Sequence, residues 1–298
     1  MAKSAALRKI ESLDPEKDAW EIVRLCVFYE FPWDFNRALE LALYKTFAVP
    51  SISRILHLSG EFEKHAQKRY DDTDLLLSEI IENGLTSGGR GMQALDRINW
   101  MHSNYRISNE DYLYVLGTFI FETSNWINQF GYRELTSKEE LAGFYIWTEI
   151  GRKMHIEAIP SSIQEFRQFY TDYEKKYFAF SEANLKVARA TEDLLLGWYM
   201  PAFMFETARP LLHAVMEPHL LKAFRYKEPG PLLRTMVKQA LRSRSLAESM
   251  IPRSKPYIRT KDHKHHFYPD GYAMEDLGPD KLFHSSKCPY HKLTNSIK

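Results

Sequence analysis

Apolar residues recur at helical spacing along most of the first 250 residues. Between residues 32 and 48, for example, they include Phe35, Leu39, Leu43 and Phe47, which are spaced so that they share one face of a helix. Hardly any stretch alternates with period two, and clusters of β-branched residues between turn residues are missing. The pattern predicts an all-α protein with about ten helices.

Capping residues locate several of these helices. In a capping box, a hydroxyl side chain is followed three residues later by an acid. Three such boxes pair Ser108 with Asp111, Thr136 with Glu139, and Ser162 with Glu165. Helices are expected near residues 18–29, 32–48, 61–70, 109–130, 137–154, 162–177, 181–199, 202–224 and 231–249, with a separate apolar run over 75–81.

The composition changes after Ile251. Proline and glycine recur from Pro252 to Pro289, and both residue types interrupt regular elements. We therefore predict one large helical domain over residues 1–250 and an irregular tail over residues 251–298. Such a tail is ordered only if it packs on the domain.

The overall charge and composition exclude several classes of protein. The chain has 298 residues, of which 40 are basic and 39 acidic, so no global field attracts nucleic acid. Its two cysteines suggest no disulfide framework. Neither a signal peptide nor an apolar run of membrane-spanning length is present. These features predict a soluble, cytoplasmic protein, although a hydrophobic substrate could draw it to a membrane surface.

One histidine lies in an unusually apolar stretch. His102 follows Ile98, Trp100 and Met101 at the expected end of a helix. Burial favours the neutral form of an imidazole, which is also the form that binds metals. A core histidine hydrogen-bonded to a backbone carbonyl explains the same stretch, and both interpretations stay open here.

A second candidate group lies upstream of His102. If residues 69–73 are helical, Arg69, Asp72 and Thr73 project from one face and could orient an oxygen ligand or a polarised substrate. The alternative is a surface Arg–Asp pair with Thr73 as the N-cap of the following helix. Glu61 and His65 could also form a ligand pair, but a solvated ion pair on a polar helix is the favoured interpretation.

The histidines of the tail are interpreted as solvated. His263, His265 and His266 are interleaved with lysines and lack the paired spacing of zinc ligands. The chain also lacks a Glu-x-x-His pair, which argues against a di-iron bundle. Nucleotide-binding loops, nucleophile elbows and zinc-protease motifs are missing as well.

Taken together, these residues resemble a known family, the latex clearing proteins (rubber oxygenases) and MpaB-type oxygenases. The resemblance extends over roughly residues 15–245. It rests on the following motifs in order: Arg69-x-x-Asp72-Thr73, Met101-His102, Tyr112-x-Tyr114-Val115, Trp126-x-x-x-Phe130-Gly131-x-Arg133, Leu135-Thr136-x-x-Glu139, and Trp147-x-x-x-Gly151-Arg152-x-Met154 with Pro160.

The resemblance implies a haem b pocket between helices. By position, His102 would be the proximal iron ligand, and Arg69 and Thr73 would lie on the distal or propionate side. Asp72 stands where rubber oxygenases have a lysine, which favours smaller prenylated substrates over polyisoprene. Glu61 is the nearest candidate for the family's catalytic glutamate. Arg69, Arg97 and Arg133 are candidate partners of the haem propionates, because guanidinium binds carboxylate in a fork.

We therefore expect a haem b-dependent oxygenase, an oxidoreductase that uses O2 on a small hydrophobic terpenoid or prenylated substrate, with oxidative cleavage of a C=C bond as the expected reaction. Arg69, Asp72 and Thr73 would shape the catalytic face. The sequence leaves the oligomeric state open. It also leaves open a non-catalytic binder of haem or of a hydrophobic ligand, and a helical interaction protein whose tail docks a partner.

Overall fold

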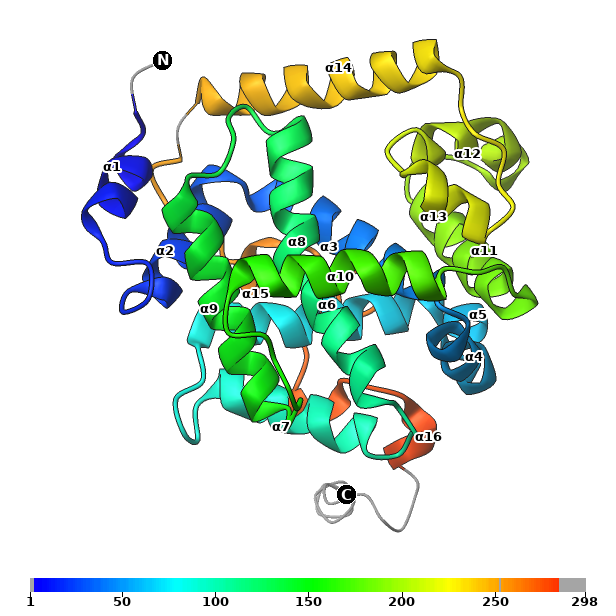
Figure 1. The fold of residues 1–298 in the computed structure, drawn as a ribbon, viewed down its shortest axis with the longest axis horizontal. Helices are drawn as coiled ribbons and strands as arrows, with labels where there is room; N and C mark the ends of the chain where they lie inside the picture. Colours follow the sequence, from blue (N-terminus) through cyan, green and yellow to red (C-terminus); the bar gives the residue numbers. More distant parts are fainter. Residues whose placement is uncertain (1–2, 252, 284–298) are drawn as a thin grey trace. The chain divides into compact units, whose positions relative to one another are not determined.

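The fold is entirely helical in the part of the chain that can be described. The computed structural model describes residues 3–251 and 253–283. These residues form sixteen α-helices, one π-helical turn and two short 3-10 turns, and no strand (Figure 1). The predicted all-α class is confirmed, although the helices are more numerous and several are shorter than expected.

The longer helices closely follow the predicted ranges. In chain order the α-helices are α1 (Ala5–Ser12), α2 (Ala19–Leu25), α3 (Pro32–Phe47), α4 (Pro50–Ser59), α5 (Glu61–Lys64), α6 (Ala66–Asn83), α7 (Arg90–His102), α8 (Asn109–Phe130), α9 (Ser137–Lys153), α10 (Ile163–Tyr177), α11 (Glu182–Gly197), α12 (Phe205–His213), α13 (Pro218–Ala223), α14 (Pro231–Ser249), α15 (Arg259–Asp262) and α16 (Asp280–Phe283).

The chain divides into two compact units. The first combines the chain up to Leu58 with Ile107–Tyr257, and the second combines Ser59–Arg106 with the chain from Ile258 onward. The boundary expected after residue 250 rests on composition and stays a prediction.

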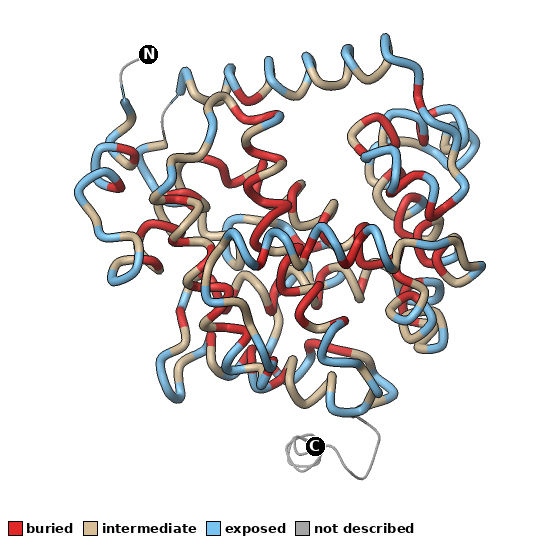
Figure 2. Tube along the Cα trace, viewed as in Figure 1, coloured by how far each residue is buried: buried red, intermediate tan, exposed pale blue. Residues whose placement is uncertain are grey.

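Helix α8 is the central element of the first unit. It packs against α3, α9, α10 and α14, and most of its residues are buried (Figure 2). Tyr114, Phe121 and Ile127 are fully buried. The capping box that begins α9 forms as predicted, because the Glu139 backbone N–H bonds to Thr136 Oγ1 and the Glu139 carboxylate accepts the Thr136 N–H. Apolar periodicity and capping together account for this unit.

Two elements of the first unit differ from the prediction. The helix expected over 18–29 starts at Ala19, but its α-helical part ends at Leu25 and it continues as a π-helical turn over Cys26–Glu30. The single helix expected over 202–224 is divided into α12 and α13. Pro218 begins α13, because its ring lacks an N–H and suits the first helical position.

Helix α6 is the central element of the second unit, and it is longer than predicted. The polar and apolar runs form one continuous helix over Ala66–Asn83. Leu75, Leu76 and Ile80 are buried, and α7 packs alongside. Thr73 therefore lies inside a helix, where its hydroxyl donates to the Arg69 carbonyl. The alternative interpretation of Thr73 as an N-cap is wrong.

The backbone at the end of α6 lies in close contact with Gly91, at the start of α7. A Cβ added to Gly91 would lie 2.1 Å from the Gly84 carbonyl oxygen and 3.1 Å from that of Glu79. Because backbone atoms cannot move aside as a flexible side chain can, only glycine allows this approach. The glycine-rich turn before α7 thus fixes how the helix carrying His102 begins.

The segment from Arg259 to Gly278 packs on α6, and α15 lies beside this helix (Figure 1). Five carboxylates of α6 accept hydrogen bonds from the segment: Asp71 from the Phe267 N–H, Asp72 from Tyr268, Asp74 from Arg259, Glu79 from Tyr272, and Glu82 from Thr260. His265 is only 4% exposed. The interpretation of the tail histidines as solvated is therefore wrong for His265, while His284 and His291 lie outside the described residues.

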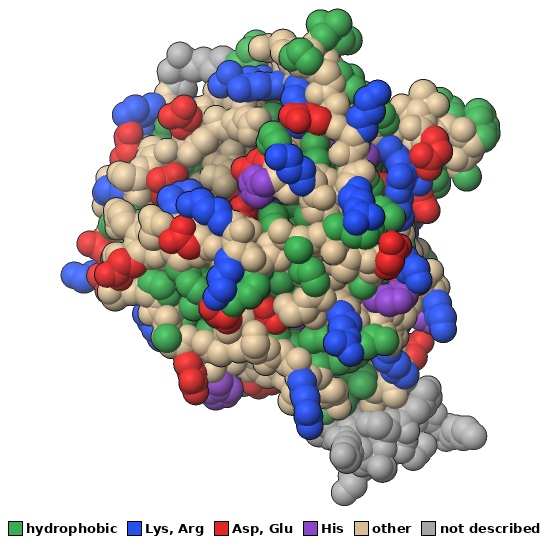
Figure 3. All heavy atoms as spheres, turned by 45° about the vertical axis from the view of Figure 1, so that its right-hand side comes forward, with side chains coloured by type: hydrophobic (Ala, Val, Ile, Leu, Met, Phe, Trp, Pro, Cys, Tyr) green, Lys and Arg blue, Asp and Glu red, His purple; other side chains and the backbone are tan. Residues whose placement is uncertain are grey.

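Within the described ranges, none of the helices is both long enough and apolar enough to cross a membrane. On the face drawn in Figure 3, basic and acidic side chains are intermixed, with hydrophobic side chains between them. No large area of one charge sign dominates that face.

Candidate functional site

His102 ends α7, as the sequence predicts. Its side chain is partly buried, and Nδ1 is shielded from solvent. Burial, followed by the positive charge of Arg69, lowers the imidazole pKa to about 4. His102 is therefore neutral at pH 7 and keeps a nitrogen lone pair, which is the form that can ligate a metal.

Arg69 lies on α6 close enough to His102 to affect its pKa. The guanidinium donates to Thr73 Oγ1 and stacks over the ring of Phe62, with 5.2 Å between the guanidinium carbon and the ring centroid. Burial lowers the Arg69 pKa, and the nearby groups of Asp72, Tyr105 and Glu61 oppose that shift. The fold thus brings Arg69, Thr73 and His102 together, with Glu61 near the same guanidinium.

Glu61 begins the short helix α5 and is 9% exposed. Its Oε1 lies 3.3 Å from Lys281 Nζ, so the carboxylate has a cationic partner from the tail. Because α5 ends at Lys64 and a new helix starts at Ala66, Glu61 and His65 do not share one helical face. The ligand pair that the sequence suggests requires both residues on one face of a continuous helix.

Asp72 is buried and is bound on both oxygens. Lys68 Nζ lies 3.2 Å from Oδ1 and 3.0 Å from Oδ2, and Tyr268 donates its hydroxyl to Oδ1 at 2.6 Å. Lys68 also donates to the Gly278 carbonyl at 2.7 Å. Burial raises the Asp72 pKa, although these partners and Arg69 favour the carboxylate. In the structure, Asp72 fastens the tail to α6.

The other two predicted arginines have partners elsewhere. The fully buried Arg97 donates from its guanidinium to the backbone carbonyls of Glu275 and Leu277. Arg133 belongs to the first unit, where it binds the carboxylates of Glu30 at 2.9 Å and Glu139 at 2.7 Å. Their pairing with haem propionates stays a prediction.

The residues around His102 fit a b-type haem in three respects. A neutral imidazole such as that of His102 is a common protein ligand of haem iron and would hold the cofactor. The neighbouring Arg69 carries the fork of donors that a propionate carboxylate requires. Phe62 and Trp100, which lie over Arg69 and beside Arg97, supply apolar surface of the kind that a flat macrocycle contacts.

Three participants in this region were missed in the sequence. Lys68 precedes Asp72 by one helical turn, and that spacing is a signal that could have identified the pair. Tyr105 follows His102 closely and could have been considered with it. Tyr268 is far from Asp72 in sequence, and no local pattern indicates their contact.

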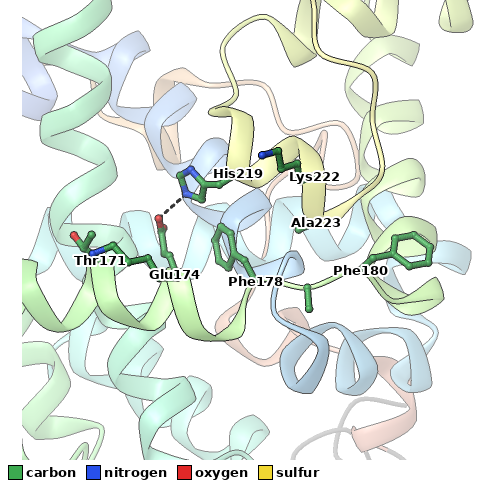
Figure 4. Close-up of a pocket in the computed structure, with 9 residues that line it drawn as sticks. Thr171, Glu174, Phe178, Phe180, His219, Lys222 and Ala223 are labelled. Atoms are coloured by element: carbon green, nitrogen blue, oxygen red, sulfur yellow. Dashed lines mark hydrogen bonds and ion pairs between the residues drawn. The ribbon is translucent and has the colours of Figure 1, made fainter.

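The first unit contains a pocket that the sequence did not indicate (Figure 4). Its volume is about 500 Å³. The lining residues are Thr171, Glu174, Lys175, Phe178, Ala179, Phe180, His219, Lys222 and Ala223. His219 Nε2 and Glu174 Oε2 lie 2.8 Å apart and form a polar pair beside the aromatic walls. This arrangement suits an amphipathic or apolar ligand.

A buried lysine neutralises the acids next to this pocket. Lys45 Nζ lies 3.0 Å from Glu122, 3.1 Å from Glu174 and 2.8 Å from Glu217, and the lysine side chain is 2% exposed. These carboxylates raise the Lys45 pKa above its ordinary value, against the effect of burial. Lys45 therefore remains charged, and its ammonium group occupies the position that a bound metal ion would have among these carboxylates.

Comparison with known proteins finds curated relatives, whereas no family model matches the chain. ER-bound oxygenase MpaB′ of Penicillium brevicompactum is 24% identical over 93% of this chain and 85% of its own length. ER-bound oxygenase MpaB of Penicillium roqueforti is 29% identical over 72% of this chain and 77% of its own. MpaB of Penicillium brevicompactum is 28% identical over 68% of this chain and 58% of its own.

These similarities confirm the resemblance that the spaced motifs indicated. They extend well beyond the Arg69–His102 region and cover most of the helical chain. Over most of its length the chain is therefore similar to MpaB-type oxygenases, and the resemblance to rubber oxygenases stays a prediction.

Proposed function

We propose that this protein is a haem b-dependent oxygenase that uses O2 to oxidise a small hydrophobic substrate of the terpenoid or prenylated class. The oxygenase part rests on relatives that carry that name. The haem part rests on one observation, a His102 imidazole with a pKa of about 4 beside the Arg69 guanidinium. Oxidative cleavage of a C=C bond is the proposed reaction.

His102 holds the cofactor through a nitrogen that needs no deprotonation at neutral pH. Bound haem supplies the redox chemistry by which O2 can be activated. Because burial is the larger cause of the lowered His102 pKa, the imidazole stays neutral even when the charge of Arg69 is compensated by a bound carboxylate.

Arg69 binds an anionic group, and its neighbours hold it in place. Thr73 Oγ1 accepts from the guanidinium while donating to the Arg69 carbonyl, which fixes both residues on the same turn of α6. The Glu61 carboxylate favours the charged form of Arg69. A guanidinium held in this way is pre-organised for a propionate or for a polar group on the substrate.

The proposal is tested first by spectroscopy on the full chain. Purified protein is supplied with haem, and the Soret band is recorded for the wild type, His102→Ala and His65→Ala. The control residue His65 is exposed and lies in the same unit. We expect a shifted or lost band only in His102→Ala. A protein that takes up no haem, or an unchanged band in His102→Ala, would contradict the proposal.

The reaction is tested with prenylated compounds of different chain length. Oxygen consumption and carbonyl-containing products are measured with haem-loaded wild-type protein and with His102→Ala. We expect substrate-dependent uptake of O2 and products shortened at a former double bond. Oxygenated products of full chain length would support the proposed oxygenase activity but contradict the proposed cleavage of a C=C bond.

The pocket beside Phe178 and Phe180 favours a second candidate function, a carrier of a hydrophobic ligand that needs no metal. Haem-free protein would then bind an apolar fluorescent probe, and Ala223→Trp, which places a large side chain at the lining, would abolish binding. Oxygen uptake that requires haem would support the oxygenase and contradict a metal-free carrier.

A further inference from the structure

We infer that Asp74, His263 and His265 form a binding site for one zinc ion, which links the tail segment to α6. This inference does not depend on the proposed haem function. Each of the three residues offers one ligand atom, and these atoms all lie within 4.8 Å of one another. All three residues belong to the second unit.

The separation of the ligand atoms suits a metal of the first transition series. Tetrahedral zinc has bonds of about 2.0 Å to nitrogen and oxygen, which places its ligand atoms about 3.3 Å apart. His265 Nδ1 lies 3.5 Å from Asp74 Oδ2, close to that value and longer than a good hydrogen bond. A small inward movement of His263 would complete a three-ligand set.

The second observation is the state of His265. The residue is 4% exposed, and neither ring nitrogen has a partner that meets ordinary hydrogen-bond geometry among the described residues. A hydrogen bond with the Arg259 backbone raises the His265 pKa, but it is the weakest of the causes that act on it. Buried imidazole nitrogens are normally satisfied, so a ligand bound at Nδ1 would explain why this ring is buried here.

The rings of His263 and His265 are oriented so that both can face one ion. The two rings are nearly perpendicular, with centroids 4.9 Å apart, so their nitrogens can approach one point from different directions.

Arg259 is the natural competitor for this site. Its Nε lies 2.6 Å from Asp74 Oδ1 and 2.8 Å from Oδ2. A carboxylate that ligates a metal through one oxygen commonly accepts a hydrogen bond on the other. Asp74 can therefore keep Arg259 on Oδ1 and offer Oδ2, the oxygen nearer to His265, to the zinc ion.

The chemistry of the ligands favours zinc over magnesium or calcium. Two imidazoles and one carboxylate are typical zinc ligands, whereas the other two ions prefer oxygen donors. Three protein ligands leave a fourth position for water. Because His263 and His265 lie in the tail and Asp74 on α6, the bound ion would tie these two elements together.

The test uses the full chain after chelator treatment and titrates it with zinc chloride against a chromogenic zinc indicator. We expect one zinc ion per chain. His265→Ala and His263→Ala should each weaken binding by at least about 100-fold, and His266→Ala, which removes an exposed neighbour, should leave it unchanged. No binding by the wild type, or equal binding in all variants, would overturn the site and leave only the Asp74–Arg259 ion pair.

A second measurement avoids variants that fail to fold. Lys261 and Lys264 are exposed, so trypsin can cut the wild-type tail just before His263, after Lys261, and between His263 and His265, after Lys264. Zinc should slow cleavage at both lysines and raise the Tm by roughly 5 °C at a hundredfold excess over Kd. Cleavage and Tm that do not respond to zinc would show that no ion links the tail to α6.

Discussion

The guanidinium of Arg69 lies close enough to His102 to lower an imidazole pKa that burial has already lowered, and together they bring it to about 4. The two residues are on successive helices of one unit, α6 and α7. A cation beside a partly buried histidine disfavours the protonated ring and favours the neutral imidazole, which is the form that can ligate a metal.

The first prediction concerns the pH dependence of stability. The folded pKa of His102 lies below its unfolded value of 6.5, so the unfolded chain binds the proton more readily as the pH falls between these values. The contribution of His102 should therefore make the wild type roughly 2 kcal/mol less stable at pH 5 than at pH 7. Urea unfolding at both pH values, compared with His102→Gln, isolates this contribution. An equal pH dependence in the two proteins would contradict it.

The second prediction concerns the buried Asp72. Asp72→Lys places a second cation against the buried Lys68 and removes one of the two acceptors of the Tyr268 hydroxyl, the other being the Asp276 carbonyl. We expect a loss of about 3–5 kcal/mol, typical of a broken buried ion pair. The charge-exchanged variant Lys68→Asp/Asp72→Lys should recover part of that loss in urea unfolding. No recovery would mean that the pair itself contributes little.

The third prediction concerns Arg97. Arg97→Ala leaves the Glu275 and Leu277 carbonyls without their donors, at a cost of about 1–3 kcal/mol for a buried acceptor. Hydrogen exchange should increase around residues 275–278 in this variant and less in Arg97→Lys. Haem retention is measured in parallel. A loss of haem affinity that exceeds the loss of stability would show that Arg97 also serves a propionate.

The fourth prediction concerns Lys45. Lys45→Met leaves Glu122, Glu174 and Glu217 facing one another without their cation, and we expect a loss of about 3–5 kcal/mol at pH 7. Because crowded carboxylates then have raised pKa values, the folded variant binds protons more readily, and part of the loss should be regained as the pH falls to 5. Lys175→Met, at an exposed ion pair, is the matched control in urea unfolding.

Local patterns predicted what depends on neighbouring residues. Helical periodicity and capping located α8, α9, α10 and α14 to within about one residue, and the apolar stretch before His102 ended a helix as expected. The one-turn spacing of Arg69 and Thr73 also placed them together correctly. These features are encoded within a few residues of one another.

The remaining features depend on residues that are far apart in sequence. No periodicity relates Asp72 to Tyr268 or Arg97 to Leu277, and proline in the tail indicated irregular structure without indicating what the tail contacts. Thr73 was open to interpretation as a cap because polar and apolar runs on α6 looked like two helices. In the structure the polar and apolar runs form the single helix α6, which packs against both α7 and the tail.

The hydrogen bonds between α6 and the tail also determine when the second unit can fold during synthesis. Asp71, Asp72 and Glu79 are each less than 3% exposed in the folded chain, yet their partners at Phe267, Tyr268 and Tyr272 leave the ribosome long after α6 does. All of α8 to α14 is made in the interval. Chains usually fold from the N-terminal end during synthesis, but here the second unit has to wait, with its acids in water, until the chain beyond residue 258 arrives.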